Sequence, residues 1–230
     1  MKYSNCELSM LTIQQNNAAV DKLKQGKAIE AFHLLSKACR AAHAVNRGEA
    51  PNHHRKYQYT WVDCSKALAH RMKGTRKFSE GSLSFLCLHF LRIEKPLECY
   101  PVGEGDPSVH VKGFIWVLWY NLAIVSILLG SPVGDCGIRL MQQSLDLFRL
   151  VQSVMDSQPF SKHWLILKLS ILNNEACVHN ELAQSHERTD RLIKMGLALS
   201  KTSGMLDPKE QELFLWTVRT MVDDRYAAAA

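Results

Sequence analysis

The sequence predicts a mainly α protein, an α-α superhelix of stacked helical hairpins with a small β-hairpin or irregular insertion. Three observations lead to this prediction. Apolar residues recur at spacings of three and four along most of the chain. Glycines, or polar breaks that contain proline, separate these stretches. An asparagine stands nine residues before a small residue at Asn17 and Gly26, at Asn121 and Gly130, and at Asn174 and Ala183.

Length and composition place the chain among globular proteins, because 230 residues with 47% hydrophobic and 22% charged side chains can bury a core. The seven cysteines include no CxxC pair of the kind that structural zinc needs. We therefore interpret them as reduced thiols. The amino-terminal stretch has no continuous apolar core of the kind found in secretory signals. These features favour a cytoplasmic location, with the nucleus as the alternative.

The first helical hairpin is predicted at about 9–44. Met10, Ile13, Val20 and Leu23 follow helical spacing, and Gly26 ends the pattern. A second helix with one apolar stripe runs from 27 to about 44. Neither helix can bury its stripe alone, so we expect the two to pair antiparallel.

The next segment, about 45–112, is predicted to be an insertion. Aromatic residues alternate with others from 57 to 62, which indicates a short strand, and a helical turn or two is expected at 65–72. The apolar stretch at 82–93 is compatible with a buried strand or a buried helix on periodicity alone. We favour a strand, and therefore a β-hairpin between the first two helical hairpins.

The stretch from Gly113 to Gly130 has no charged residue and is about eighteen residues long, so it is either a buried helix or a membrane span. Trp116 and Trp119 fall in its middle rather than at its ends, where interfacial aromatics would lie. No cluster of Lys or Arg flanks either end. We favour a buried helix and expect no membrane span.

The remaining chain continues the hairpin pattern. Helices are expected at about 138–155, 162–182 and 187–200. The start of a last helix has a capping-box pattern, with Asp207, Pro208 and Glu210 at its N-cap, N1 and N3 positions. We therefore divide this single domain into repeat 1 (about 9–44), the insertion (about 45–112), repeat 2 (about 113–156), repeat 3 (about 160–203) and a capping helix (about 207–226).

Two stretches match a known repeat pattern. In the first helix of a repeat, the matching residues are Trp119, Leu122, Ala123 and Ser126. In the second helix, they are Ala31, Leu35 and Ala38. The chain is in this respect similar to tetratricopeptide-repeat (TPR) proteins, although Gln15, Ala18 and Lys22 hold the family's Trp, Leu and Tyr positions in repeat 1. The resemblance implies a scaffold that binds another protein or peptide in a concave groove and has no chemistry of its own.

The resemblance also implies a binding site. In peptide-binding members of the family an asparagine of the first helix faces the groove, which implies that Asn17, Asn121 and Asn174 bind the backbone of an extended partner segment. An amide side chain donates and accepts, so it can hold a peptide group without selecting a side chain. Lys24, further along the first helix, would add a charge for an acidic ligand end. The alternative is that each asparagine only bonds a neighbouring helix or turn.

The insertion is the most basic part of the chain. Residues 45–80 contain eight Lys or Arg and three acidic residues, within a chain of net charge +6. Cations there are interleaved with aromatics, as on nucleic-acid surfaces. Contact with RNA is therefore the alternative function, and a solvated basic loop is the competing interpretation. The basic patch consists of Arg55, Lys56, Lys66, Arg71, Lys73, Arg76 and Lys77.

Catalytic motifs are not found in the sequence. It contains no GxSxG and no HExxH. Cys177 and His179 are two residues apart on a predicted helix, which points them to different faces and does not suit a nucleophile and its base. We expect no metal and no cofactor, and predict a non-enzymatic interaction scaffold or adaptor.

Overall fold

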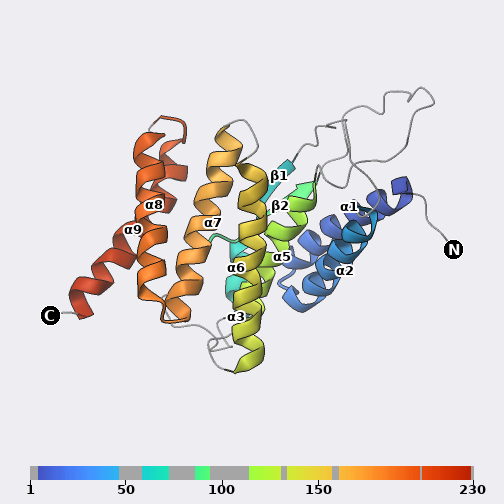
Figure 1. Cartoon of the computed structure of the whole chain (residues 1–230), viewed down its shortest axis with the longest axis horizontal. Helices are drawn as coiled ribbons and strands as arrows, with labels where there is room; N and C mark the ends of the chain where they lie inside the picture. Colours follow the sequence, from blue (N-terminus) through green and yellow to red (C-terminus); the bar gives the residue numbers. More distant parts are fainter. Residues whose placement is uncertain are drawn as a thin grey trace.

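A computed structural model describes residues 5–46, 59–72, 86–93, 114–130, 134–156, 161–202 and 204–228. Within them the protein is mainly helical, with eight helices and one two-stranded antiparallel sheet, as the sequence predicts. Figure 1 shows the helices side by side, with the amino-terminal pair at one end of the molecule and the carboxy-terminal helices at the other.

Helical hairpins make up most of this structure. The pairs are α1 (Asn5–Lys24) with α2 (Ala28–Asn46), α5 (Ile115–Leu129) with α6 (Asp135–Met155), and α7 (Lys162–Glu181) with α8 (Ser185–Lys201). Neighbouring hairpins meet where α2 packs on α5 and where α6 packs on α7. The last helix, α9 (Pro208–Ala228), packs against α8 and α7. Each hairpin therefore buries its apolar stripe against its neighbours.

The predicted and observed helix boundaries differ most at the first residues of two helices. Helix α1 begins at Asn5 rather than near 9, and α6 begins at Asp135 rather than near 138. Both first turns carry few apolar residues, so apolar spacing could not reveal them.

Two hairpin turns use the same backbone conformation with different residues. Gly26 has φ +72°, and the amide of Lys27 donates to the carbonyl of Lys22 at 2.9 Å. Ala183 has φ +55° after α7, and the amide of Gln184 donates to the carbonyl of His179 at 2.8 Å. A glycine adopts this conformation without strain, whereas an alanine does not.

Helix α5 is the centre of the core. Thirteen of its fifteen residues are buried, and α2, α6 and β2 (His89–Ile93) all contact it. At 1.5 Å per residue it is about 22 Å long, shorter than the ~30 Å hydrocarbon layer of a bilayer. Among the described residues, no helix has the length and apolar character needed to cross a membrane.

The insertion contains the predicted β-hairpin. Strand β1 (Tyr59–Asp63) pairs antiparallel with β2, with Trp61 opposite Leu91. Helix α3 (Ser65–Met72) follows β1, also as predicted. The second strand is shorter than the predicted 82–93, because 86–88 lie outside the ladder and 82–85 lie outside the described residues.

The capping box at the start of α9 is confirmed. The amide of Asp207 donates to the Glu210 carboxylate at 3.0 Å, and the amide of Glu210 donates to Asp207 Oδ1 at 2.9 Å. The Glu210 carboxylate also lies 2.8 Å from Lys162 Nζ, which links the starts of α7 and α9.

Candidate functional site

The three predicted asparagines all bind one extended segment of the chain, residues 86–93. Asn121 on α5 binds both backbone groups of Leu91. Its Nδ2 donates to the carbonyl at 2.7 Å, and its Oδ1 accepts from the amide at 2.9 Å. The others act alike: Asn17 on α1 binds Ile93 at 2.8 and 3.0 Å, and Asn174 on α7 binds Cys87 at 3.1 and 2.8 Å.

A second asparagine precedes two of these three. Asn16 Nδ2 donates to the Leu91 carbonyl at 3.1 Å, and Asn16 Oδ1 accepts from Asn121 at 2.9 Å. Asn173 Nδ2 donates to Asn174 Oδ1 at 3.2 Å. These neighbours fix which way each side-chain amide is turned. Asn16 and Asn173 were not among the predicted site residues, although the paired asparagines at 16–17 and 173–174 are visible in the sequence.

The other edge of the segment is paired with β1. Thr60 lies opposite Arg92 and Val62 opposite Phe90, and beyond the ladder the amide of Cys64 donates to the Leu88 carbonyl at 3.1 Å. Backbone groups of successive residues in a strand point to opposite sides. The backbone amides and carbonyls of the even-numbered residues therefore point toward β1, and those of the odd-numbered residues point toward the asparagines. We call this arrangement, Asn17, Asn121 and Asn174 bound to 86–93, the asparagine ladder.

The segment is also packed tightly. Leu86, Leu88, Phe90, Leu91 and Ile93 are at most 7% exposed. The three asparagines that were predicted to bind a partner segment therefore bind the chain's own residues 86–93. Binding of a partner segment there stays a prediction.

The ladder draws one asparagine from each of three hairpins onto one peptide backbone. Comparisons with protein-family models, curated proteins and solved structures find no match to this chain.

Lys24 lies near the end of α1 without reaching the segment's backbone by any described bond. Its Nζ is 3.8 Å from Asp21 Oδ1. The same oxygen accepts from Arg92 Nη1 at 2.9 Å, so Asp21 fixes the one cation of the segment to α1. Lys24 therefore already has a carboxylate nearby, and its predicted role toward an acidic ligand end is untested.

The basic patch is mostly beyond the described part of the chain. Lys66 is exposed on α3. Arg71 belongs to the same helix, and its side chain is outside the description. The other five residues, Arg55, Lys56, Lys73, Arg76 and Lys77, lie outside the described residues.

A thiol and an imidazole meet inside the ladder. Cys87 Sγ lies 3.3 Å from His89 Nδ1 and 3.3 Å from Ser170 Oγ. The contact with Cys87 raises the pKa of His89, and Asp63 adds to the effect. Such a pair resembles a nucleophile with its base, but Cys87 is only 6% exposed and Asn174 fixes its backbone. We interpret the pair as a packing contact within the asparagine ladder.

The Cys87–His89 pair was not predicted from the sequence, where only the Cys177 and His179 spacing was considered for a nucleophile and its base. Residues two apart on a strand share a face, unlike residues two apart on a helix. The described cysteines are free thiols, as expected. Burial raises the pKa of Cys64 to about 11 and that of Cys39 to about 12, so both stay protonated. Within the described ranges, no group of three or more His, Cys, Asp or Glu could hold a metal ion.

Proposed function

We propose that this chain is a non-enzymatic interaction scaffold that binds an extended segment of another protein in the groove of the asparagine ladder. The observation that carries the proposal is that three asparagines, one from each hairpin, bind both backbone groups of single residues in one extended segment, 86–93. A side chain that bonds only backbone recognises conformation rather than sequence.

We further propose that the hairpins form a TPR-like superhelix. Two facts support this arrangement: successive hairpins pack through α2 on α5 and α6 on α7, and the first helix of each hairpin supplies the groove asparagine. In such a stack the first helices line one surface, which suits a ligand that crosses them in turn.

The ladder defines the chemistry of a ligand. It needs an extended backbone with free amides at three positions of the same parity, equivalent to 87, 91 and 93. Proline has no amide hydrogen and is excluded from these positions. The side chains at the positions equivalent to 88 and 90 need to be apolar, because Leu88 and Phe90 are buried.

The resident segment sets the energetic condition for binding. Exposing five large apolar side chains at ~1.5–3 kcal/mol each costs on the order of 10 kcal/mol. This is comparable to the ~5–15 kcal/mol that stabilises a whole domain. A partner segment therefore replaces residues 86–93 only if it brings the same apolar pattern, or if the resident segment has been weakened.

The test weakens the resident segment and leaves the asparagines intact. A fluorescein-labelled peptide with the sequence of 86–93, flanked by lysines for solubility, is titrated with the wild-type chain and with the variant Phe90→Leu/Ile93→Val. We expect fluorescence anisotropy to report tighter binding to the variant, because its own segment competes less well. Adding Asn121→Leu to the variant should abolish binding, as should proline at the Leu91 position of the peptide.

The proposal is contradicted if the peptide fails to bind a variant that circular dichroism shows to be folded. It is equally contradicted if binding persists unchanged with Asn121→Leu. Should the double variant not fold, Ile93→Val alone, expected to cost only ~0.5–1.5 kcal/mol, replaces it.

A further inference from the structure

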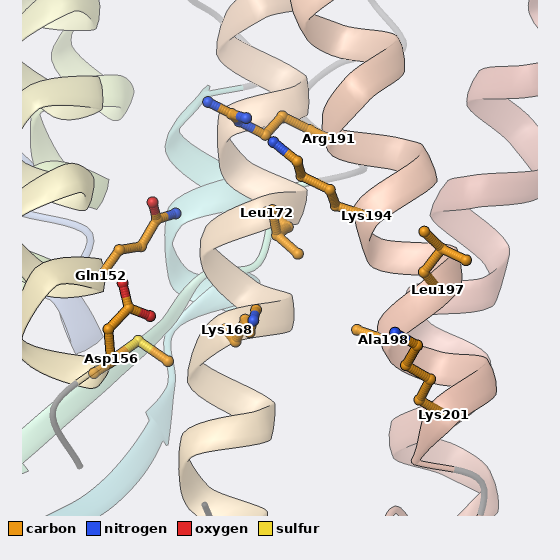
Figure 2. A pocket seen from close by; sticks show the side chains of 10 residues that line it. Gln152, Asp156, Lys168, Leu172, Arg191, Lys194, Leu197, Ala198 and Lys201 are labelled. Atoms are coloured by element: carbon orange, nitrogen blue, oxygen red, sulfur yellow. The ribbon is translucent and has the colours of Figure 1, made fainter.

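A cavity of about 380 Å³ lies between α6, α7 and α8. Figure 2 shows side chains from these three helices around it. Its size is near the lower end of the ~300–1,000 Å³ typical of binding pockets.

This cavity is separate from the asparagine ladder. On α7, Leu172 lines the cavity while Asn174 binds Cys87. Two residues along a helix are ~200° apart around its axis. The cavity and the ladder therefore use nearly opposite faces of α7, and a ligand in one need not disturb the other.

The lining of the cavity is cationic. The described residues that line it include four cations, Lys168, Arg191, Lys194 and Lys201, and one carboxylate, Asp156. A ligand with negative charge is therefore favoured.

Two of the four cations already have partners. Arg191 lies 2.7 Å from Glu175 and 2.7 Å from Asp190, and Lys194 lies 2.7 Å from Asp190. Lys168 and Lys201 are exposed and make no ion pair within the part of the chain that the structure describes. These two lysines are the cations available to a ligand.

The cavity also has an apolar side. Leu172 and Ala198 line it, and Leu197 lines it while remaining 53% exposed. Ile193, one turn earlier on α8, is 57% exposed. Large aliphatic side chains this exposed, side by side on one helix face, would be stabilised by an apolar cover.

We propose that this cavity binds an acidic segment of a partner protein that carries large apolar side chains. An apolar side chain of the partner covers Leu172 and Leu197, and flanking carboxylates pair with Lys168 and Lys201. The described residues that line the cavity include no aromatic side chain, so they offer the bases of a nucleic acid no aromatic stacking surface. An inorganic anion would meet the lysines and leave Leu197 uncovered.

The probe is a fluorescein-labelled peptide of about twelve residues, rich in glutamate, with two leucines four residues apart. Its anisotropy is measured with the wild-type chain, with Lys168→Glu/Lys201→Glu and with Leu197→Ser. The matched control is Lys37→Glu/Arg40→Glu, which makes the same charge change at two exposed cations of α2. We expect about tenfold weaker binding for the cavity double variant, a change within about twofold for the control, and weaker binding for Leu197→Ser.

Three results would overturn this assignment: no binding to the wild type, equal loss in both double variants, or equal binding of a peptide whose leucines are replaced by serine. Competition by inorganic phosphate or a single-stranded oligonucleotide as effective as that by the unlabelled peptide would also overturn it, because charge alone would then explain binding. The acidic peptide and the 86–93 peptide are separate probes, so failure of this proposal is distinguishable from failure of the ladder proposal.

Discussion

Asn121 binds Leu91 through both backbone groups, at 2.7 Å to the carbonyl and 2.9 Å to the amide. This is the pair of bonds that a neighbouring strand would make. A helix thus takes the place of a β-strand beside β2, and it does so again at Cys87 and Ile93. The result is a strand paired by a strand on one edge and by helices on the other.

Loss of the central asparagine should destabilise the fold. Asn121→Leu keeps a side chain of similar size but leaves the buried amide and carbonyl of Leu91 with fewer partners. We expect a loss of about 2–4 kcal/mol in the free energy of unfolding, measured with urea. Gln142→Ala, at an exposed position of α6, should stay within about 0.5 kcal/mol. Equal effects of the two changes would refute a structural role for the ladder.

The turn after α7 should tolerate glycine better than its native residue. Ala183 has φ +55°, in the left-handed region. Ala183→Gly is therefore expected to stabilise the fold by about 0.5–1 kcal/mol in thermal or urea unfolding. Ala18→Gly, at an exposed position inside α1, should destabilise it by about 1 kcal/mol. The two substitutions must change the stability in opposite directions if Ala183 has positive φ.

The end of α5 should not accept a side chain at Gly130. A Cβ there would lie 2.9 Å from Met141 Cγ and 3.1 Å from the Ser126 carbonyl oxygen. Gly130→Ala should cost about 1–3 kcal/mol. In a double-mutant cycle, Gly130→Ala/Met141→Ala should lose less stability than the sum of the two single losses, because truncating Met141 relieves one contact.

Gly196 is the matched control for that experiment. It lies within α8, and a Cβ there would meet nothing within 4 Å. Gly196→Ala should therefore stabilise the fold by about 0.5–1 kcal/mol through helix propensity. Destabilisation at both glycines would mean that the contact at Met141 is not the cause.

The buried carboxylate of α7 should make stability depend on pH. Burial raises the pKa of Glu175 above its usual 4.5, while Arg191 opposes the shift. The folded state then binds this proton more tightly than the unfolded state, so stability falls as pH rises from about 4.5 through the raised pKa. Glu175→Gln removes this loss. The stability of this variant relative to wild type should therefore increase from about pH 4 to pH 7, seen as a larger free energy of unfolding.

Urea titrations at the two pH values check this sign. Gln142→Ala, which removes no titratable group from an exposed position of α6, should differ from wild type by the same amount at both pH values. If Glu175→Gln instead loses more stability at the higher pH, attraction to Arg191 exceeds the cost of burying the charge.

Local signals in the sequence were sufficient for the helices, the β-hairpin and the position of the asparagines. Gly26 indicates a turn because a glycine backbone adopts positive φ readily. Asp207 and Glu210 indicate a helix start because their carboxylates can accept from the free amides there. The turn at Ala183 carries no such mark, since alanine rarely adopts positive φ. Its place was nonetheless found by repetition of the nine-residue spacing.

The occupant of the groove could not be predicted from the sequence. Cys87 and Asn174 are 87 positions apart, and helical register shows which side chains face a groove but not what fills it. The cationic cavity has the same limit, because Lys168 and Lys201 come together only through the packing of α7 on α8. Long-range partners of this kind follow from packing rather than from local pattern.

Amide hydrogen exchange at single residues tests the asparagine ladder most directly. Each asparagine should protect its own partner, so Asn174→Ala should speed exchange of the Cys87 amide about tenfold and leave the Ile93 amide nearly unchanged. Asn17→Ala should do the reverse. If either variant instead speeds both amides equally, the asparagines act only through overall stability, and the one-to-one binding of backbone groups on which this account depends is wrong.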